Sequence, residues 1–214
     1  MGVKDRLDFT FLTACEEDLR EVFQIYLEDI NQLIVQFEIT KNEFPVEIQN
    51  EIRAMFGHMA RAAMAETPEI AQSNVAKMKS HTKRALLDCF KYCCVIYTDR
   101  YTDFFQKYNG VDLSYLNDGK FLPEVHAKYS AAKQSLLDAK ALEVSNASDE
   151  ELFDAYQEAF NMYGDLCYLL DCASESADYL QHKATKKEKM ANISFAIGAV
   201  GTIVGIISLI ISFF

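Results

Sequence analysis

The stretch that decides the fold is LFDAYQEAFNMYGDLCYLLDCASESADYL, residues 152–180. Small and apolar residues recur in it at alternating steps of four and three, the repeat of a helix that packs lengthwise against other helices. No proline interrupts the stretch, so the pattern predicts one long helix with a continuous inward face. The positions in this register are Leu152, Tyr156, Ala159, Tyr163, Leu166, Leu170, Ala173, Ala177 and Leu180.

The same register continues into the apolar tail ISFAIGAVGTIVGIISLIISFF, residues 193–214. Small residues permit close backbone approach between membrane helices, so we predict that the stripe is a contact between copies of the chain. Alternatively, residues 152–180 face their own domain's core, and glycine and serine are ordinary in membrane helices. The stripe consists of Ser194, Gly198, Gly201, Gly205, Ser208 and Ser212.

The tail has the length of a membrane anchor. Its 22 uncharged residues, at about 1.5 Å each, span about 33 Å, enough for a hydrocarbon core of about 30 Å. A basic cluster precedes the tail and favours the cytoplasmic side. We therefore expect a single-pass protein of the cell inner membrane with its N-terminal domain in the cytoplasm, and a ring of copies could line a narrow pore. The cluster contains His182, Lys183, Lys186, Lys187 and Lys189.

The rest of the chain also has a helical period. We expect an all-α bundle of about five helices in residues 1–189, followed by the anchor in residues 190–214. Capping and turn residues mark the expected ends. The expected helices are one opened by a Thr13–Glu16 capping box and ended at residues 42–45, one over 46–65, one from Thr67 and Pro68 to Asn109 and Gly110, one over 123–144, and one opened by Ser148 and Glu151.

Composition narrows the function classes. A formal net charge of −11 argues against duplex DNA as a partner. The N-terminus has no apolar run of signal-peptide length, so a reducing cytoplasm and free thiols are expected. Cys89 and Cys93 share a helix face, but no close partner pair completes a tetrahedral metal site, so we expect neither metal nor cofactor. The cysteines are Cys15, Cys89, Cys93, Cys94, Cys167 and Cys172.

Two motifs carry candidate chemistry. RAMFGH places Arg53 and His58 five positions apart, and such a pair can cleave RNA without metal, the histidine moving protons and the arginine stabilising a phosphorane. The alternative is a surface ion pair or a contact at the core edge. The basic run KMKSHTKR, residues 77–84, is interpreted as a solvated face that balances the acidic runs at 15–21 and 148–154, with a phosphate site as the alternative.

On this motif and its helix count over residues 10–185, the chain resembles the HEPN superfamily. HEPN proteins are small helical bundles whose ribonuclease members carry an arginine, four to six residues and a histidine. The resemblance implies RNA cleavage by Arg53 and His58, although Ala54 stands where active members commonly have a polar residue. The combination of such a bundle with an anchor is similar to certain CRISPR accessory proteins.

The expected function is that of a self-associating, tail-anchored membrane effector and not primarily that of an enzyme. In a bacterial defence or growth-arrest system, a protein partner would trigger it to perturb or permeabilise the inner membrane. One alternative is a membrane-tethered HEPN-type endoribonuclease. RNA is a partner only under this hypothesis. A second is a passive adaptor that localises another protein to the membrane.

Overall fold

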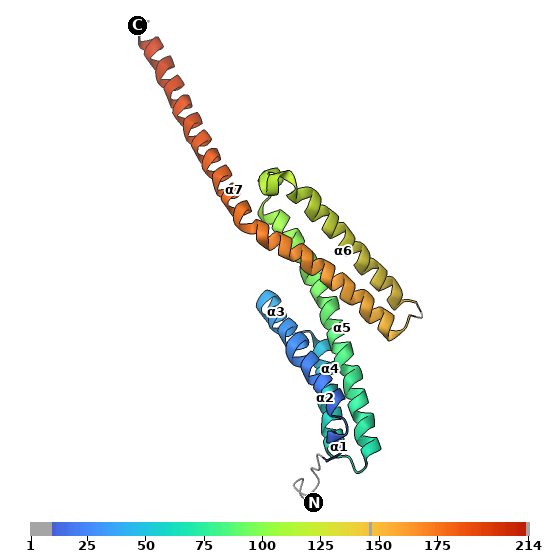
Figure 1. The fold of residues 1–214 in the computed structure, drawn as a ribbon. Helices are drawn as coiled ribbons and strands as arrows, with labels where there is room; N and C mark the ends of the chain where they lie inside the picture. Colours follow the sequence, from blue (N-terminus) through green and yellow to red (C-terminus); the bar gives the residue numbers. More distant parts are fainter. Residues whose placement is uncertain (1–9, 146, 213–214) are drawn as a thin grey trace, which may run out of the picture. The chain divides into compact units, whose positions relative to one another are not determined.

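The protein is all-helical over the described residues. The structure, a computed structural model, describes the backbone of residues 10–145 and 147–212, and leaves the side chains of residues 188, 191, 192 and 196–214 undescribed. No strand occurs in these described ranges, which confirms the predicted class. The elements in Figure 1 are α1 (Thr10–Thr13), α2 (Glu16–Gln24), the π-helix η2 (Ile25–Ile30), α3 (Asn31–Lys41), α4 (Val46–Ala63), α5 (Pro68–Lys107), the 3₁₀ segment η3 (Leu113–Gly119), α6 (Phe121–Glu143) and α7 (Asp149–Ser212).

Local signals place most helix ends where the sequence predicts them. At the start of α5, the Thr67 hydroxyl accepts a hydrogen bond from the Ile70 N–H at 3.4 Å. After α5, Gly110 adopts φ +80°, a left-handed conformation that glycine adopts without steric strain. The predicted capping box before α7 is confirmed, because Ser148 N–H donates to the Glu151 carboxylate and Glu151 N–H donates to the Ser148 hydroxyl, at 2.8 and 3.2 Å.

The capping box predicted at Thr13 and Glu16 is wrong. The N-cap of α2 is Cys15, which makes no side-chain capping bond. Its side chain is instead buried in a cluster with Ala62 of α4 and Val75 of α5. Packing between helices, and not a local hydrogen bond, therefore sets where α2 begins.

The chain folds into two compact units. Unit 1 comprises the residues up to Thr98 together with Ala132–Tyr163, and unit 2 comprises Asp99–Ala131 together with the residues from Gly164 onward. Helices α5, α6 and α7 therefore each contribute residues to both units. The domain boundary predicted between residues 189 and 190 lies inside unit 2 and stays a prediction.

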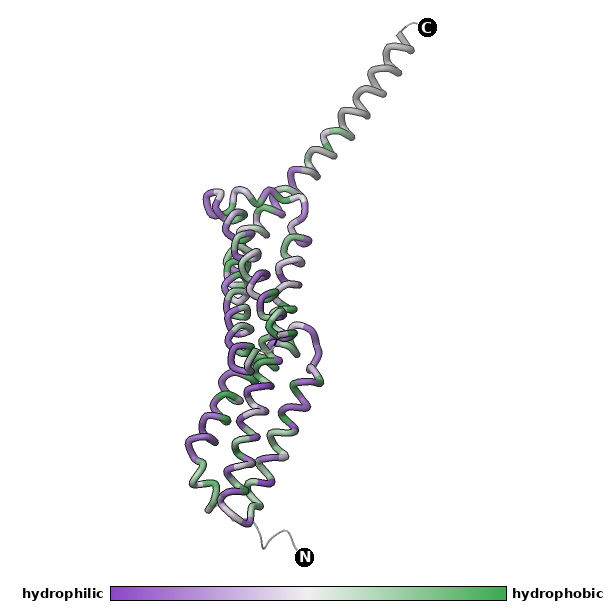
Figure 2. Tube along the Cα trace, turned by 90° about the vertical axis from the view of Figure 1, so that its right-hand side faces the viewer, coloured by the Kyte–Doolittle hydropathy of each residue, from purple (hydrophilic) through white to green (hydrophobic). Residues whose placement is uncertain are grey.

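In unit 1, α2, α4 and α5 lie side by side (Figure 1). Val22, Met55 and Met78, one from each helix, form a buried cluster. Helix α3 packs on α5 through Phe37, which is fully buried and makes a T-shaped contact with Tyr92 at 5.0 Å between ring centroids. Figure 2 shows hydrophobic and hydrophilic positions succeeding one another along these helices, the amphipathic pattern that buries one face of each.

The register over residues 152–180 faces inward. In unit 1, Tyr156, Ala159 and Tyr163 are buried, and Phe160 stacks on Phe90 of α5 at 4.8 Å between ring centroids. In unit 2, three further register positions are buried, namely Leu166, Leu170 and Ala177. This part of the register therefore contacts the core of its own chain, as the alternative interpretation of residues 152–180 expects.

Unit 2 holds α7 through polar contacts around Tyr108. The Tyr108 hydroxyl, on a side chain that is 2% exposed, donates to the Asp178 carboxylate at 2.8 Å. Lys107 also lies 2.8 Å from this carboxylate, and these partners hold the pKa of Asp178 below its usual range. One turn later, the Gln181 amide donates to the Lys107 carbonyl at 2.8 Å. These contacts attach α7 to the end of α5.

Candidate functional site

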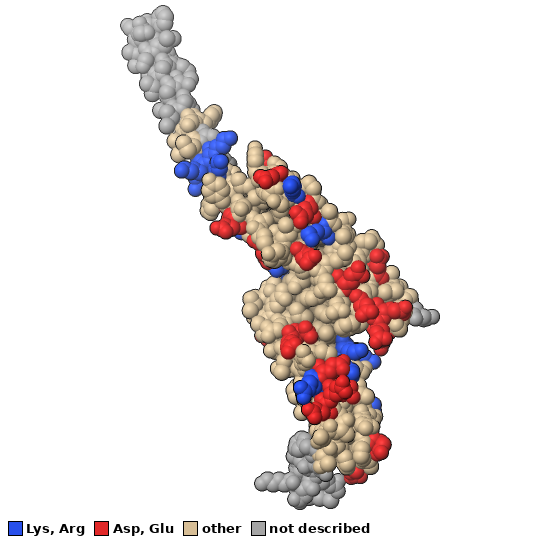
Figure 3. Space-filling model, viewed as in Figure 1, with Lys and Arg blue, Asp and Glu red and all other residues tan. Residues whose placement is uncertain are grey.

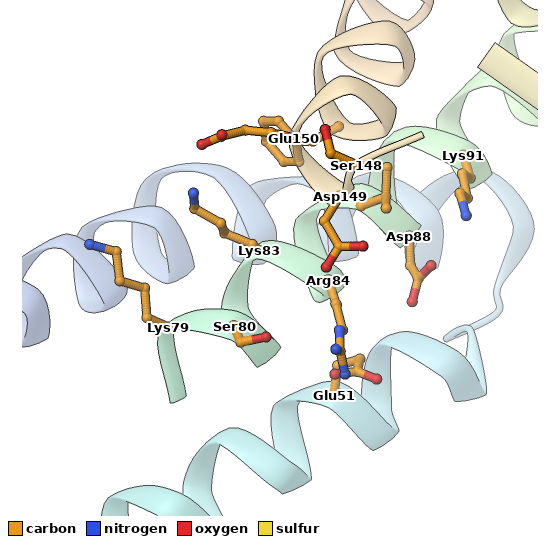
Figure 4. Close-up of a pocket in the computed structure, with 12 residues that line it drawn as sticks. Glu51, Lys79, Ser80, Lys83, Arg84, Asp88, Lys91, Ser148, Asp149 and Glu150 are labelled. Carbon is orange, nitrogen blue, oxygen red and sulfur yellow. The ribbon is translucent and has the colours of Figure 1, made fainter. Parts of the chain in front are cut away.

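A charged cleft of about 650 Å³ lies in unit 1 where α4, α5 and the start of α7 meet. Figure 4 shows its polar side chains, with basic groups along α5 and carboxylates from all three helices. Leu87 and Phe153 add apolar surface. The cations are Lys79, Lys83, Arg84 and Lys91, and the carboxylates are Glu51, Asp88, Asp149 and Glu150.

Two of these four cations already have carboxylate partners on other helices. Lys79 lies 3.1 Å from Asp18 and 2.5 Å from Glu21, a contact between the basic run and the acidic run at 15–21 that the sequence predicts. Lys91 lies 2.5 Å from Glu143, and its ammonium sits 5.0 Å from the centre of the Tyr156 ring. Two cations of the cleft are therefore already held by carboxylates of neighbouring helices that do not themselves line it.

Burial and neighbouring charges shift the pKa values of carboxylates in and near the cleft. Burial raises the pKa of Asp88 against the opposing effect of Lys91, and Glu51 adds to the increase. The Lys91 ammonium holds the pKa of Glu143 below its usual range. With equal numbers of acidic and basic groups, the cleft has no excess of positive charge with which to attract a phosphate. The phosphate-site alternative for residues 77–84 gains no support from this geometry.

The predicted catalytic pair lies on α4, but its two members contact different partners. Arg53 is exposed, and its guanidinium donates to the Asn50 side-chain carbonyl at 3.3 Å. His58 is half-buried, and its Nδ1 lies 3.0 Å from Oδ1 of Asn74 on α5. The structure therefore does not bring Arg53 and His58 together within one chain.

His58 instead belongs to a polar cluster that sequence reasoning missed. Its ring stacks on His81 at 5.2 Å, and Nη1 of Arg61 lies 3.4 Å from its Nδ1. Nδ1 of His81 lies 2.6 Å from the Glu51 carboxylate, which orients that imidazole. Glu51 and His81 are 30 residues apart, so only the pairing of α4 with α5 reveals the cluster. The groups satisfy one another's hydrogen bonds at a helix interface.

The tail side chains lie mostly outside the described residues. Among the stripe residues, Ser194 is described and exposed, while Gly198, Gly201, Gly205, Ser208 and Ser212 have no described side chains. Within the part of the chain that the structure describes, no helix is both long and apolar enough to cross a membrane. The backbone of α7 nevertheless stays helical to Ser212. The membrane-helix prediction for residues 193–214 stays a prediction.

The basic cluster before the tail is well described. Lys183, Lys186, Lys187 and Lys189 are all exposed. Figure 3 shows lysines gathered on α7 next to the undescribed atoms, whereas acidic groups are spread over the rest of the visible face. The cluster is thus a local positive region on an acidic protein.

The six cysteines are free thiols in the structure. Five are buried and Cys172 is exposed. Burial raises the pKa of Cys89 and of Cys94 to about 12, and that of Cys167 to about 11. Within residues 10–145 and the described later residues, no group of three His, Cys, Asp or Glu side chains could hold a metal ion.

These thiols give a direct prediction. In the native full-length protein in mild detergent, we expect one thiol to react rapidly with a disulfide reagent near pH 8 and the others to react only after denaturation. Because the thiolate is the nucleophile, burial should slow the other five by about 100-fold or more. Cys172→Ser should remove the fast phase, whereas Cys89→Ser should leave it. A second fast thiol would contradict the buried placement of the remaining cysteines.

Comparison of the chain with protein-family models, with curated proteins and with solved structures finds no match. The resemblance to HEPN proteins therefore stays a prediction from Arg53, His58 and the helix count.

Proposed function

We propose that this protein is a self-associating membrane effector whose helical bundle is anchored by the C-terminal part of α7. The observation that carries the proposal is the unbroken course of α7 from Asp149 to Ser212. The same helix supplies core residues to both units and ends in the uncharged tail. A helix satisfies its own backbone hydrogen bonds in lipid, so a helical tail is suited to insertion.

The continuity of α7 also supports the transmission of a signal from the bundle to the membrane helix. Tyr156 and Leu166 fix the rotation of α7 in the bundle by burying one face of the helix. Because an α-helix has a fixed residue repeat, that rotation extends along the same helix to the small-residue stripe. A trigger protein that rearranges the bundle would thereby change how the stripes of neighbouring copies meet. In a defence or growth-arrest system, this change would make the inner membrane leaky.

The test is membrane potential in bacterial cells that overproduce the protein, followed with a potential-sensitive dye. We expect the full chain to depolarise the cells and a chain without residues 193–214 to be inactive. Gly201→Leu should also abolish the effect, because a large side chain at the stripe separates the helix axes and removes the close packing between them. Ala199→Leu is the matched control and should retain full activity, because at about 100° per residue this position lies about 160° around the helix from Gly201.

Other outcomes would select other functions. Toxicity of the chain without its tail, lost on Arg53→Ala or His58→Ala, would replace this proposal with a ribonuclease. An inserted protein that neither depolarises cells nor cleaves RNA would be an adaptor. Under our proposal, Arg53→Ala and His58→Ala leave depolarisation unchanged.

A further inference from the structure

A basic segment of α7 follows directly after the contacts that attach this helix to unit 2. Gln181 makes the bond to Lys107 described above. From His182 to Phe195, every side chain that the structure describes is exposed. The segment 182–190 contains four lysines and one glutamate, within a chain of formal net charge −11. A strongly positive, solvent-facing stretch therefore separates the bundle from the uncharged tail.

The lysines share one side of the helix. At about 100° per residue, the four positions fall within about 160° of the helix circumference. Met190 and Ile193 lie on the same side and are 61% and 60% exposed. The lysines form no ion pair with any carboxylate whose side chain is described, in contrast to Lys79 and Lys91 in unit 1. This side of α7 thus presents exposed ammonium groups beside apolar side chains.

The spacing matches the headgroup layer of a bilayer. If the hydrocarbon core begins near Ile193, a rise of about 1.5 Å per residue places Lys189 about 6 Å from it and Lys183 about 15 Å from it. The polar layer on each side of a bilayer is about 5–8 Å thick. Electrostatic attraction extends about 8–10 Å further in physiological salt. Flexible lysine side chains allow all four ammonium groups to reach phosphate oxygens.

We infer that Lys183, Lys186, Lys187 and Lys189 form a binding surface for anionic phospholipid headgroups. The inference rests on the proposed membrane anchoring and names the lipid that the anchor selects. Each lysine near an anionic surface contributes about 1 kcal/mol. Met190 and Ile193 add apolar contact at the same interface. The surface also offsets the repulsion between an acidic bundle and an acidic membrane.

The experiment uses the full chain in nanodiscs of phosphatidylcholine with phosphatidylglycerol. After gentle release into detergent, native mass spectrometry counts the lipids that remain bound. We expect the ratio of phosphatidylglycerol to phosphatidylcholine among the bound lipids to exceed the ratio in the bilayer by at least about tenfold, since two lysines at about 1 kcal/mol each suffice for it. Replacing all four lysines by glutamine should abolish the enrichment, and replacing them by arginine should preserve it.

The matched control changes the same number of charges elsewhere. Its substitutions are Lys77→Gln, Lys83→Gln, Lys120→Gln and Lys140→Gln, all at exposed positions on the bundle. We expect this control to keep the enrichment, because its lysines lie outside the segment before the tail. An equal loss in both variants would overturn the inference and indicate an effect of net charge. No enrichment by the unaltered protein would overturn it as well.

Failure of this inference can be told apart from failure of the proposed function. Carbonate-resistant flotation with vesicles of the same lipid composition reports insertion. Insertion without phosphatidylglycerol enrichment overturns the lipid inference and leaves the anchor in place. Enrichment without depolarisation of cells supports the lipid inference and overturns the effector proposal. A chain that does not insert overturns both.

Discussion

Truncation after Lys189 is expected to move the protein from the carbonate-resistant membrane fraction to the soluble fraction. The removed residues include the whole uncharged segment 193–214, whose apolar side chains would hold the protein in lipid irrespective of salt or pH. The contacts that attach α7 to unit 2, at Asp178 and Gln181, precede the cut. The truncated protein should therefore keep its helical circular-dichroism spectrum while it loses membrane association.

A second variant tests whether the tail must be apolar, and not only present, for the protein to insert. In the full chain, Ile203→Lys combined with Ile207→Lys places two charges at membrane depth, each at about 2.5–3.5 kcal/mol near the helix centre. This variant should be released by carbonate as completely as the truncated protein. Ile203→Leu is the control and should remain membrane-bound. Release of the unaltered chain by salt alone would show that attraction of charges, and not apolar insertion, holds it.

Phe37→Ala is expected to be the most damaging single substitution that we consider in the bundle. The ring is 0% exposed and makes a T-shaped contact with Tyr92 on α5. Its removal leaves a cavity where α3 meets α5, and truncations of this kind cost about 3–5 kcal/mol. Urea unfolding of the full chain in mild detergent, followed by circular dichroism, should show a correspondingly lower midpoint.

The matched control is the same substitution at a partly solvated phenylalanine. Phe56 lies on α4 and is 56% exposed, so Phe56→Ala removes much less buried surface. We expect it to lower the free energy of unfolding by less than about 1.5 kcal/mol, because little apolar area returns to water. Equal losses at both positions would contradict the core placement of Phe37.

Helix positions were predictable because their causes are local. Thr67, Gly110 and the Ser148–Glu151 box act on backbone groups within a turn of themselves. Hydrogen bonds of such short range depend on the order of residues and not on the rest of the fold. The start of α2 was not predictable in this way, since Cys15 is held there by residues of α4 and α5.

The candidate site shows that spacing along the sequence does not predict which side chains contact each other. Arg53 and His58 lie on one helix at a suggestive interval, yet the imidazole of His58 meets Asn74, Arg61 and His81. The periodicity of α4 indicated which of its faces is apolar, but it carried no information on the helix against which that face packs. Contacts between residues far apart in the chain depend on which helices pack against each other in the folded protein.

The sequence by itself determined the helical class, the long last helix and its four-three register, because hydrophobic period and capping act along the chain. Tertiary structure alone decided that Tyr156, Tyr163 and Leu166 are buried in their own chain. An apolar stripe must be covered, but its period is the same whether the covering helix is intramolecular or belongs to another copy. Only the packing of α7 with its neighbours distinguishes the two for residues 152–180.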